Sequence, residues 1–468
     1  MNYRVVAAVA AVSIGLMSAP LAAAQPTSGT SGTSDPTSSS VTSTPFTTPN
    51  TDNCANKTAP PKAIDSSEVP APGQSAPDPL PVPATPVGGT RLGECGVITP
   101  DGAAALPKDI SATSWVLSDL DSGQVVAAKD PHGRYRPAST IKILLSIVAL
   151  RELDLNKVVI GTQDDADADG TRVGIGPGGK YSNIDLMHAL VMASGNDAAH
   201  AISTQLGGDA ATVQKMNDVA QSLGAKDTRA ATPAGLDGPG MSSSAYDLSL
   251  FFREAMENPT FADLIHTQQY PFPGYPGQPT TNTDTDASST SPGESTTVTS
   301  TDLPGFPIGN DNQLLYDYEG ALGGKTGYTD DSRQTFVAGA ERNGRRLAIT
   351  LMKGEVLPIR PWEQAARLLD WGFALPRTAA VGALVEPGTV AAQPLPPLAA
   401  PPTADSLTQA APLGDTKAES PFDRFLTEHG KAIVLVAGSA LVLGLIVWAM
   451  AISGNDSGRH NHRQRRRR

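Results

Sequence analysis

The sequence predicts an α+β domain, in which an antiparallel sheet packs against a block of helices, followed by a C-terminal transmembrane helix. Strand-like segments occur near residues 114–130 and 333–352, and helix-like segments lie between them. An uncharged apolar run covers residues 432–452 near the C-terminus. Because the strands flank the helical block, we expect the first and last strands to share one antiparallel sheet.

Two hairpins supply the strands of the predicted sheet. Residues 114–130 read S-W-V-L-S-D-L-D-S-G-Q-V-V-A-A-K-D, in which Trp115 and Leu117 share one face and D-S-G forms the turn. Residues 335–354 read T-F-V-A-G-A-E-R-N-G-R-R-L-A-I-T-L-M-K-G, with an N-G turn at Asn343. Both segments therefore predict antiparallel strand pairs.

Helices fill the chain between the two hairpins. Apolar residues at helical spacing predict helices over 139–153, 184–206, 212–223 and 245–257. A final amphipathic helix begins at Pro361, because proline favours the first position of a helix. A domain of about 270 residues is long enough to bury a substantial core.

The N-terminus has the features of a secretory signal peptide over residues 1–24. Arg4 gives a positive start, the apolar stretch 5–17 is too short to span a bilayer, and the small residues at 22–24 match a cleavage site. We therefore expect cleavage before Gln25 and export of the rest of the chain.

The uncharged run at 432–452 predicts a membrane-spanning helix, because about 20 apolar residues cross the hydrocarbon core. The alternative is a buried core helix, but the preceding linker offers no core. The basic tail R-H-N-H-R-Q-R-R-R-R follows, and positive charge marks the cytoplasmic side. We expect a single-pass protein of the cell membrane, with residues before Lys431 outside and the C-terminus in the cytosol.

Charge and cysteine content narrow the function classes. The formal net charge of −12 includes the basic tail, so the exported part is more acidic still, and no nucleic-acid partner is expected. Beside a membrane helix, we expect the tail to be a topology anchor or to contact acidic lipids. Cys54 and Cys95 are the two cysteines, and in an exported chain they are expected to form a disulfide that staples a loop.

Shifts in composition divide the chain into segments. A polar insertion at 277–302 predicts a mobile surface loop, and an Ala/Pro linker covers 391–421. The predicted domains are a signal peptide at 1–24, a flexible Ser/Thr/Pro-rich stalk at 25–105, a globular domain at 106–377, a Pro/Ala-rich linker at 378–430, a transmembrane helix at 431–453 and a basic cytoplasmic tail at 454–468.

Lys142 raises the first chemical question, because it lies in the apolar run P-A-S-T-I-K-I-L-L-S-I-V-A-L. Pro137 stops a helix from passing through Ala138, so we expect a helix to begin at Ser139. Ser139 and Lys142 would then share one face. A lysine kept out of water has a lowered pKa and can take a proton from a serine hydroxyl. The alternative is a surface lysine that keeps its charge in water.

The triplet Ser194-Gly195-Asn196 is the second element, and it interrupts a helical pattern. The Ser194 hydroxyl could relay a proton to a leaving group, and the Asn196 amide could orient Lys142. A polar turn between helices is the alternative for such a triplet.

The run Gly324-Lys325-Thr326-Gly327 precedes the second hairpin. Glycines let the backbone lie close to a ligand, and Lys325 and Thr326 could hold a carboxylate. A glycine turn with a solvated lysine is the alternative for this run alone.

In this order, the three elements resemble the S-x-x-K, S-x-N and K-T-G set of penicillin-binding proteins and class A β-lactamases. The chain closely resembles the low-molecular-mass D-alanyl-D-alanine carboxypeptidases, in which S-G-N is usual. The further matches are S-G-N-D-A-A at 194–199, T-P-A-G-L-D-G-P-G-M-S-S-S-A-Y-D-L at 232–248, N-D-N-Q-L-L at 310–315 and G-G-K-T-G-Y-T at 323–329. This resemblance implies a β-lactamase/transpeptidase-like fold.

The resemblance also implies a reaction. Ser139 would attack the carbonyl between two D-alanines of a peptidoglycan stem peptide, Lys142 would take its proton, and Ser194 would help protonate the departing D-alanine. Water would then hydrolyse the acyl-enzyme, which limits cross-linking of the wall. β-Lactam antibiotics would acylate Ser139 in the same way and inhibit the enzyme.

Substrate binding follows from the same resemblance. Asn196, Lys325, Thr326 and Gly327 would contact the substrate, with Lys325 and Thr326 on its terminal carboxylate. The backbone N–H groups of Ser139 and Tyr328 would form the oxyanion hole. The family often has histidine where this chain has Tyr328, and the all-β second domain of some members has no counterpart. No cofactor and no metal is expected.

Other motifs predict other chemistry less well. Residues 174–179 match G-x-G-x-x-G, but no strand precedes them and a proline lies inside, so a dinucleotide site is disfavoured. Asp165, Asp167 and Asp169 imitate an EF-hand whose twelfth position is Gly176 instead of glutamate. No H-E-x-x-H or G-x-S-x-G occurs, which disfavours a zinc peptidase and a Ser-His-Asp hydrolase.

Three alternative functions remain. A membrane-tethered β-lactamase would use the same fold, but it needs a glutamate-activated water, and Glu254 and Glu257 fall in an ordinary helical pattern. A D,D-endopeptidase would use the same residues on cross-linked peptides. A non-catalytic wall-binding module would lack one of the motifs, whereas all three are intact.

Overall fold

The computed structural model describes residues 46–277, 280–281, 298–299 and 301–391. The chain divides into a unit of residues 1–47 and a compact unit that begins at Thr48. All the elements described here belong to the second unit.

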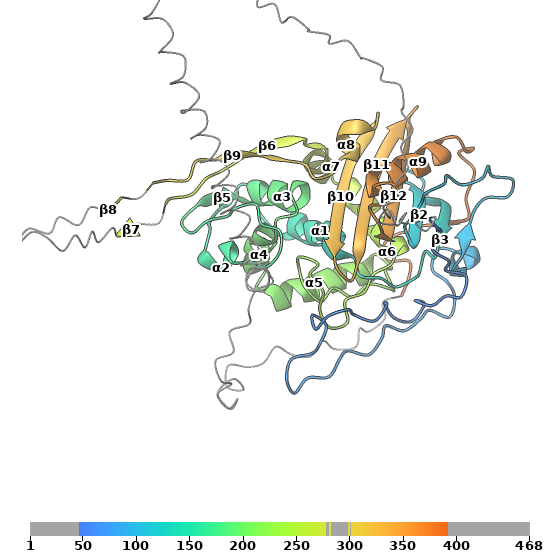
Figure 1. Ribbon diagram of the computed structural model, residues 1–468, viewed down its shortest axis with the longest axis horizontal. Coiled ribbons are helices and arrows are strands. Elements are labelled where there is room, and N and C mark those ends of the chain that lie inside the picture. The colour runs from blue at the N-terminus through green and yellow to red at the C-terminus, as the bar shows by residue number, and fades with distance from the viewer. Residues whose placement is uncertain (1–45, 278–279, 282–297, 300, 392–468) are drawn as a thin grey trace, which may run out of the picture. The chain divides into compact units, whose positions relative to one another are not determined.

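A seven-stranded sheet forms the centre of this unit (Figure 1). All its strand pairs are antiparallel. The N-terminal β2 lies beside the C-terminal β12, so the predicted shared sheet is confirmed. The order is β1 (Val97–Ile98), β3 (Gln124–Lys129), β2 (Ser114–Asp119), β12 (Arg345–Gly354), β11 (Arg333–Arg342) and β10 (Ala321–Thr329), with β13 (Gly382–Ala383) also paired to β3.

Helices cover both faces of the sheet. Side chains alternate along β2, so that Val116 joins the core beneath the main helical block and Leu117 joins the core beneath α9. The predicted α+β class is therefore confirmed. The helical elements are η1 (Thr90–Gly93), η2 (Ala138–Ile141), α1 (Lys142–Glu152), α2 (Gln163–Ala166), α3 (Asn183–Met192), α4 (Asn196–Gln205), α5 (Asp209–Ser222), α6 (Ala245–Met256), α7 (Pro259–His266), α8 (Leu314–Asp317) and α9 (Pro361–Phe373).

Three two-stranded sheets lie outside the central sheet in the described residues. Strand β4 (Val158–Ile160) pairs with β5 (Lys180–Ser182), and β6 (Gln269–Phe272) pairs with β9 (Phe306–Gly309). The described parts of the insertion predicted at 277–302 also pair, as β7 (Thr280–Thr281) with β8 (Val298–Thr299).

The helical pattern predicted over 184–206 forms two helices, α3 and α4, and the break between them lies at the triplet that was predicted to interrupt the pattern. Ser194 has a φ of 59°, a left-handed conformation that no α-helix contains. The helix predicted to begin at Ser139 also differs, since Ser139 lies in the 3₁₀ turn η2 and α1 begins at Lys142.

The flexible stalk predicted at 25–105 is wrong for residues 48–105. This segment packs on the globular domain, where Arg134 donates to the carbonyl oxygens of Thr58 at 2.7 Å and Pro81 at 2.9 Å. The predicted disulfide between Cys54 and Cys95 is present, with an S–S distance of 2.01 Å. The backbone of residues 48–105 is held by hydrogen bonds from a buried arginine side chain. The segment is therefore not a flexible spacer, although it is rich in proline. Residues 25–45 lie outside the described residues.

The C-terminal boundary predicted at 377 is also too early. Gly382 pairs with Val125 in the sheet, and Leu384 is buried in the core. The domain therefore continues to at least residue 384. Within the described residues, no helix has the length and apolar character needed to cross a membrane. The predicted signal peptide at 1–24, the segment 392–430, the transmembrane helix at 431–453 and the tail at 454–468 lie outside the described residues.

Candidate active site

The three sequence motifs meet at one place, beside strand β10. Lys142 Nζ lies 2.7 Å from Ser139 Oγ and 2.7 Å from Asn196 Oδ1, which joins the S-x-x-K and S-G-N motifs. A Cβ placed on Gly327 would lie 2.9 Å from the backbone nitrogen of Ser139. The K-T-G strand therefore runs directly against the turn that carries Ser139, and only glycine allows this approach.

The 3₁₀ turn explains why Ser139 and Lys142 meet. Side chains three residues apart eclipse one another in a 3₁₀ turn, so the pair faces more directly than on an α-helix. Ser139 is half-buried, whereas Lys142 is fully buried in the apolar core. The surface-lysine alternative for Lys142 is therefore wrong.

Lys142 is placed to act as a base. Its burial and, second, the positive charge of Lys325 hold the pKa of Lys142 well below its usual value. A neutral amine has two N–H donors and one lone pair. Asn196 Oδ1 and the Ala234 carbonyl oxygen, each 2.7 Å from Nζ, accept the two N–H groups. The lone pair is then left for the hydroxyl proton of Ser139.

Asn196 is fixed by a loop that the sequence motifs did not include. Its Nδ2 donates to the Asp169 carbonyl oxygen at 2.6 Å, which turns Oδ1 toward Lys142. A Cβ on Gly170 would lie 2.6 Å from the same Nδ2, so the loop must carry glycine there. Asp169 belongs to the false EF-hand pattern, and its backbone has this different role.

Ser194 lies just before α4, at the break between the two helices. Its residue is 7 % exposed, and its φ of 59° is the strained left-handed conformation. Among the described residues, its hydroxyl has no hydrogen-bond partner. The proton of Ser194 is therefore available to a bound molecule.

Lys325 is a buried cation on the K-T-G strand. Its residue is 2 % exposed, and burial lowers the pKa of Lys325 to about 8, against the opposing charge of Asp311. Its Nζ donates to the Thr326 carbonyl oxygen at 2.9 Å. At neutral pH this group stays charged and has donors left for an anion.

Asp311 was missed as a site residue by the sequence analysis. Its backbone N–H donates to the Met192 carbonyl oxygen at 2.8 Å, which places it next to the S-G-N break. Partial burial raises the pKa of Asp311, while Lys325 and Lys142 oppose that rise. The stretch N-D-N-Q-L-L at 310–315, which matches the carboxypeptidase family, contains Asp311. That match did not indicate a role for the Asp311 carboxylate.

Tyr328 and Thr326 complete the strand. The Tyr328 side chain is 48 % exposed, and its hydroxyl donates to Asp330 Oδ1 at 2.7 Å. The ring therefore lies on the surface, and the backbone of Tyr328 is what adjoins the site. Thr326 is half-buried and Gly327 is buried.

The glycine-rich run at 174–179 and the EF-hand-like run that begins at Asp165 both make structural contacts within the protein. The Asp197 carboxylate accepts the backbone N–H groups of Val173, Gly174 and Ile175 at 3.1, 2.8 and 3.0 Å, so the glycine-rich loop is tied to α4. Asp165 caps its own helix at Thr162 and contacts His200 Nδ1 at 2.7 Å.

Known proteins resemble this chain in sequence and in fold. A family profile described as D-alanyl-D-alanine carboxypeptidase, peptidase S11, matches residues 101–273. D-alanyl-D-alanine carboxypeptidase DacB2 of Mycobacterium tuberculosis is 44% identical over 291 residues, which cover 61% of this chain and 90% of that protein. DacD of Escherichia coli is 30% identical over 280 residues, covering 57% of this chain and 64% of that protein.

A solved structure agrees with these relatives. The crystal structure of a D-alanyl-D-alanine carboxypeptidase from Mycobacterium tuberculosis has a TM-score of 0.53 and 44% identity, and covers 61% of this chain and 100% of that one. The fold and the converging motifs define a serine-type peptidase. The chain belongs to the peptidase S11 family and is a D-alanyl-D-alanine carboxypeptidase, a hydrolase whose substrates are peptidoglycan peptides.

Proposed function

We propose that Ser139 is the nucleophile and Lys142 the base of this carboxypeptidase. The observation that carries the proposal is the 2.7 Å contact between Ser139 Oγ and the buried Nζ of Lys142, whose pKa is held well below its usual value by burial. Ser139 Oγ forms a bond to the carbonyl carbon of the penultimate D-alanine, and its proton passes to Lys142.

Ser194 serves the leaving group. As the C–N bond breaks, the departing amine takes a proton through the Ser194 hydroxyl, which has no competing partner among the described residues. A water molecule then attacks the ester on Ser139, releases the shortened stem peptide and regenerates the hydroxyl.

Lys325 and Thr326 hold the terminal carboxylate of the substrate. Burial strengthens the attraction of Lys325 for an anion, because a low-dielectric site screens charge poorly. Strand β10 ends the described sheet, so its outer edge can pair with an extended peptide. The backbone N–H groups of Ser139 and Tyr328 stabilise the oxyanion.

β-Lactams acylate Ser139 by the same attack, and slow hydrolysis distinguishes this enzyme from a β-lactamase. A class A β-lactamase needs a glutamate-activated water. Glu254, one of the glutamates weighed for that role, pairs with Arg151 at 2.6 Å on the surface. D,D-endopeptidase activity uses the same residues on a cross-linked substrate.

The test uses the full chain in detergent with a pentapeptide stem and with penicillin. We expect release of free D-alanine, a persistent penicillin adduct on Ser139 by mass spectrometry, and loss of both in Ser139→Ala. Equal D-alanine release by Ser139→Ala would refute the nucleophile. Rapid loss of the penicillin adduct would favour the β-lactamase.

We also propose that the enzyme is a single-pass protein of the cell membrane, with the catalytic domain outside and the C-terminus in the cytosol. The charge-free run 432–452 and the basic tail after it support this topology. Protease added to intact cells should remove the catalytic domain and leave a C-terminal tag protected. Protection of both ends would contradict the topology.

A further inference from the structure

The chain that leads into Ser139 is covered by an N-terminal strap, residues 48–98. The strap accepts hydrogen bonds along the whole approach: the Pro49 carbonyl oxygen accepts from Lys129, and the Asn56 carbonyl oxygen accepts the backbone N–H of Arg134 at 2.8 Å. The strap precedes residues 101–273, the part that the family profile matches.

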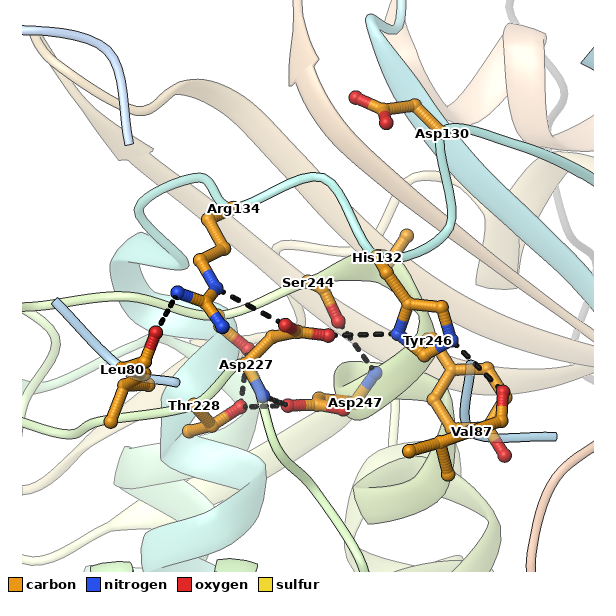
Figure 2. Close-up of polar contacts among 12 residues, drawn as sticks. Leu80, Val87, Asp130, His132, Arg134, Asp227, Thr228, Ser244, Tyr246 and Asp247 are labelled. Atoms are coloured by element: carbon orange, nitrogen blue, oxygen red, sulfur yellow. Dashed lines mark hydrogen bonds and ion pairs between the residues drawn. The ribbon is translucent and has the colours of Figure 1, made fainter. Parts of the chain in front are cut away.

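The first anchor of the strap is Arg134 (Figure 2). This arginine is 1 % exposed, and its guanidinium donates to strap carbonyl oxygens at Leu80 and Pro81. Its Nε donates to Asp227 Oδ1 at 3.1 Å. One buried arginine thus joins the strap to the catalytic domain, and Asp227 compensates its charge.

His132 strengthens the same anchor. Its Nδ1 lies 2.8 Å from Asp227 Oδ2, and its Nε2 lies 3.0 Å from the Val87 carbonyl oxygen of the strap. Both partners only accept, so both ring nitrogens carry protons and the ring is cationic. Burial opposes this charge, but the hydrogen bond to Asp227 and its charge outweigh burial and raise the pKa of His132.

A metal is a poorer explanation of this cluster. Ligand atoms of His132, Asp227 and Asp247 lie within 4.8 Å of one another. However, Asp227 already accepts from two cations, and Asp247 Oδ2 accepts from the Asp227 backbone N–H and from the Thr228 hydroxyl, each at 2.8 Å. In Figure 2, hydrogen bonds already engage both ring nitrogens of His132 and both carboxylate oxygens of Asp227, and Asp247 Oδ1 is the carboxylate oxygen of the cluster that has no hydrogen-bond partner among the described residues.

The second anchor is Arg136, three residues before the nucleophile. Its side chain is 2 % exposed, and it forms a two-pronged ion pair with Glu68 of the strap, with Nη2 at 2.7 Å from Oε2. Its Nη1 also donates to the Pro61 carbonyl oxygen at 2.8 Å. The strap residue Ile64 donates its backbone N–H to Asp331, in the turn that follows the K-T-G strand, at 2.8 Å.

Ala138 explains why these anchors matter for catalysis. It separates Arg136 from Ser139 and has a φ of 47°, a conformation that a residue with a Cβ keeps only when its surroundings impose it. Directly before Ala138, the Pro137 carbonyl oxygen accepts a hydrogen bond from Thr335 Oγ1 at 2.9 Å. On the N-terminal side, the side chain of Arg136 is held by the strap.

We propose that the strap is a positioning part of the active site, and that Glu68 is its key positioning residue. Glu68 fixes Arg136, Arg136 fixes the strained turn at Ala138, and that turn presents Ser139 Oγ to Lys142. The inference rests on the proposed role of Ser139 as the nucleophile. It adds a residue outside the matched family segment to the machinery that orients the reaction.

The test compares Glu68→Gln with a matched control, Glu94→Gln, in the full chain in detergent. Glu94 lies on the same strap and makes only a surface pair with Arg91 at 3.8 Å. We measure the rate constant for acylation by a fluorescent penicillin and the thermal midpoint. Because small displacements of a nucleophile cost large rate factors, Glu68→Gln should slow acylation about 10- to 100-fold. Glu94→Gln should change it less than about twofold.

Steady-state kinetics on a pentapeptide separate positioning from general damage. Glu68 and Arg136 act on the turn that carries the nucleophile, so kcat should fall in Glu68→Gln while KM stays near the wild-type value. Glu68→Asp keeps the carboxylate and should recover part of the lost rate. If Glu68→Gln does not fold, the acylation rates of Glu68→Asp and Arg136→Lys test the proposal instead. Each of these variants keeps the charge but loses the two-pronged geometry of the Arg136–Glu68 ion pair.

Two outcomes would overturn the proposal. One is wild-type acylation in every Glu68 and Arg136 variant that folds. The other is a loss of rate that only matches the fraction of unfolded protein. Wild-type adduct at a residue other than Ser139 would instead refute the proposed nucleophile, so the two failures are distinguishable.

Discussion

Lys142 and Lys325 are both buried, but burial and neighbouring charges lower their pKa values to different extents. Both residues are buried, at 0 % and 2 % exposure. Lys142 has three polar contacts at 2.7 Å, and burial together with the charge of Lys325 keeps its pKa well below the usual value. Burial lowers the pKa of Lys325 to about 8, and the nearby negative charge of Asp311 opposes that fall.

This difference assigns the two lysines to two tasks. A neutral amine can take the Ser139 proton, whereas a cation can hold a carboxylate. The first task depends on Lys325, because its positive charge helps to lower the pKa of Lys142. The pair therefore resembles other sites in which like charges push two pKa values apart.

Removal of the Lys142 amine should have the largest effect. Lys142→Met should lower penicillin acylation by about a thousandfold, because general-base catalysis is lost. Lys142→Arg should be equally inactive, since guanidinium does not deprotonate at accessible pH. Acylation is followed with a fluorescent penicillin. Retention of a tenth of the wild-type rate by Lys142→Met would exclude the amine as base.

Loss of the Lys325 charge should have the second-largest effect. Lys325→Gln should lower kcat/KM for a pentapeptide by about a hundredfold, because the carboxylate loses its cation. It should also raise the pKa of Lys142, since a nearby positive charge no longer opposes protonation. The acid limb of the kcat/KM profile should therefore move to higher pH. An unmoved limb would show that the two lysines are independent.

Loss of the Asp311 charge should act in the opposite direction and more weakly. Asp311 raises the pKa of both lysines, so Asp311→Asn should move both limbs of the kcat/KM profile to lower pH. The rate at neutral pH should change by about two- to threefold. A shift of either limb to higher pH in this variant would contradict the assignment.

His132 differs from both lysines, because its pKa is raised. Its folded-state pKa lies above the ordinary value of 6.5, so its contribution to stability is complete below pH 6.5 and is lost as pH rises through the folded value. The thermal midpoint of the wild type should fall by about a few degrees more than that of His132→Gln as pH rises above 7. Parallel curves for the two proteins would show that the ring is not charged in the fold.

The predictable parts of the site are those with local signals. The spacing of Ser139 and Lys142, the S-G-N triplet and the K-T-G run are short patterns, and the structure brings them together. The two hairpins carry alternating apolar residues and turn motifs, so their strands could be predicted as well. These signals lie between residues that are close in the sequence, so their order and spacing were sufficient to predict the strands and the motifs.

The unpredictable parts depend on contacts between distant residues. Ser, Thr and Pro dominate the strap, and that composition favours a spacer, yet Arg134 and Arg136 hold it from the other side of the domain. Asp311 gains its role from the two lysines, which are far from it in sequence. The S-G-N triplet indicated a break in the helical pattern, but the strained left-handed φ of Ser194 had no signal in the sequence.

A titration of the two lysines by NMR tests the central claim most directly. In protein labelled with ¹³C at the lysine Cε, the Lys142 signal is assigned by its absence in Lys142→Met and the Lys325 signal by its absence in Lys325→Gln. We predict that at pH 7 the Lys142 amine is neutral, while Lys325 is charged and titrates near pH 8. A Lys142 signal that stays that of an ammonium up to pH 10 would contradict the account.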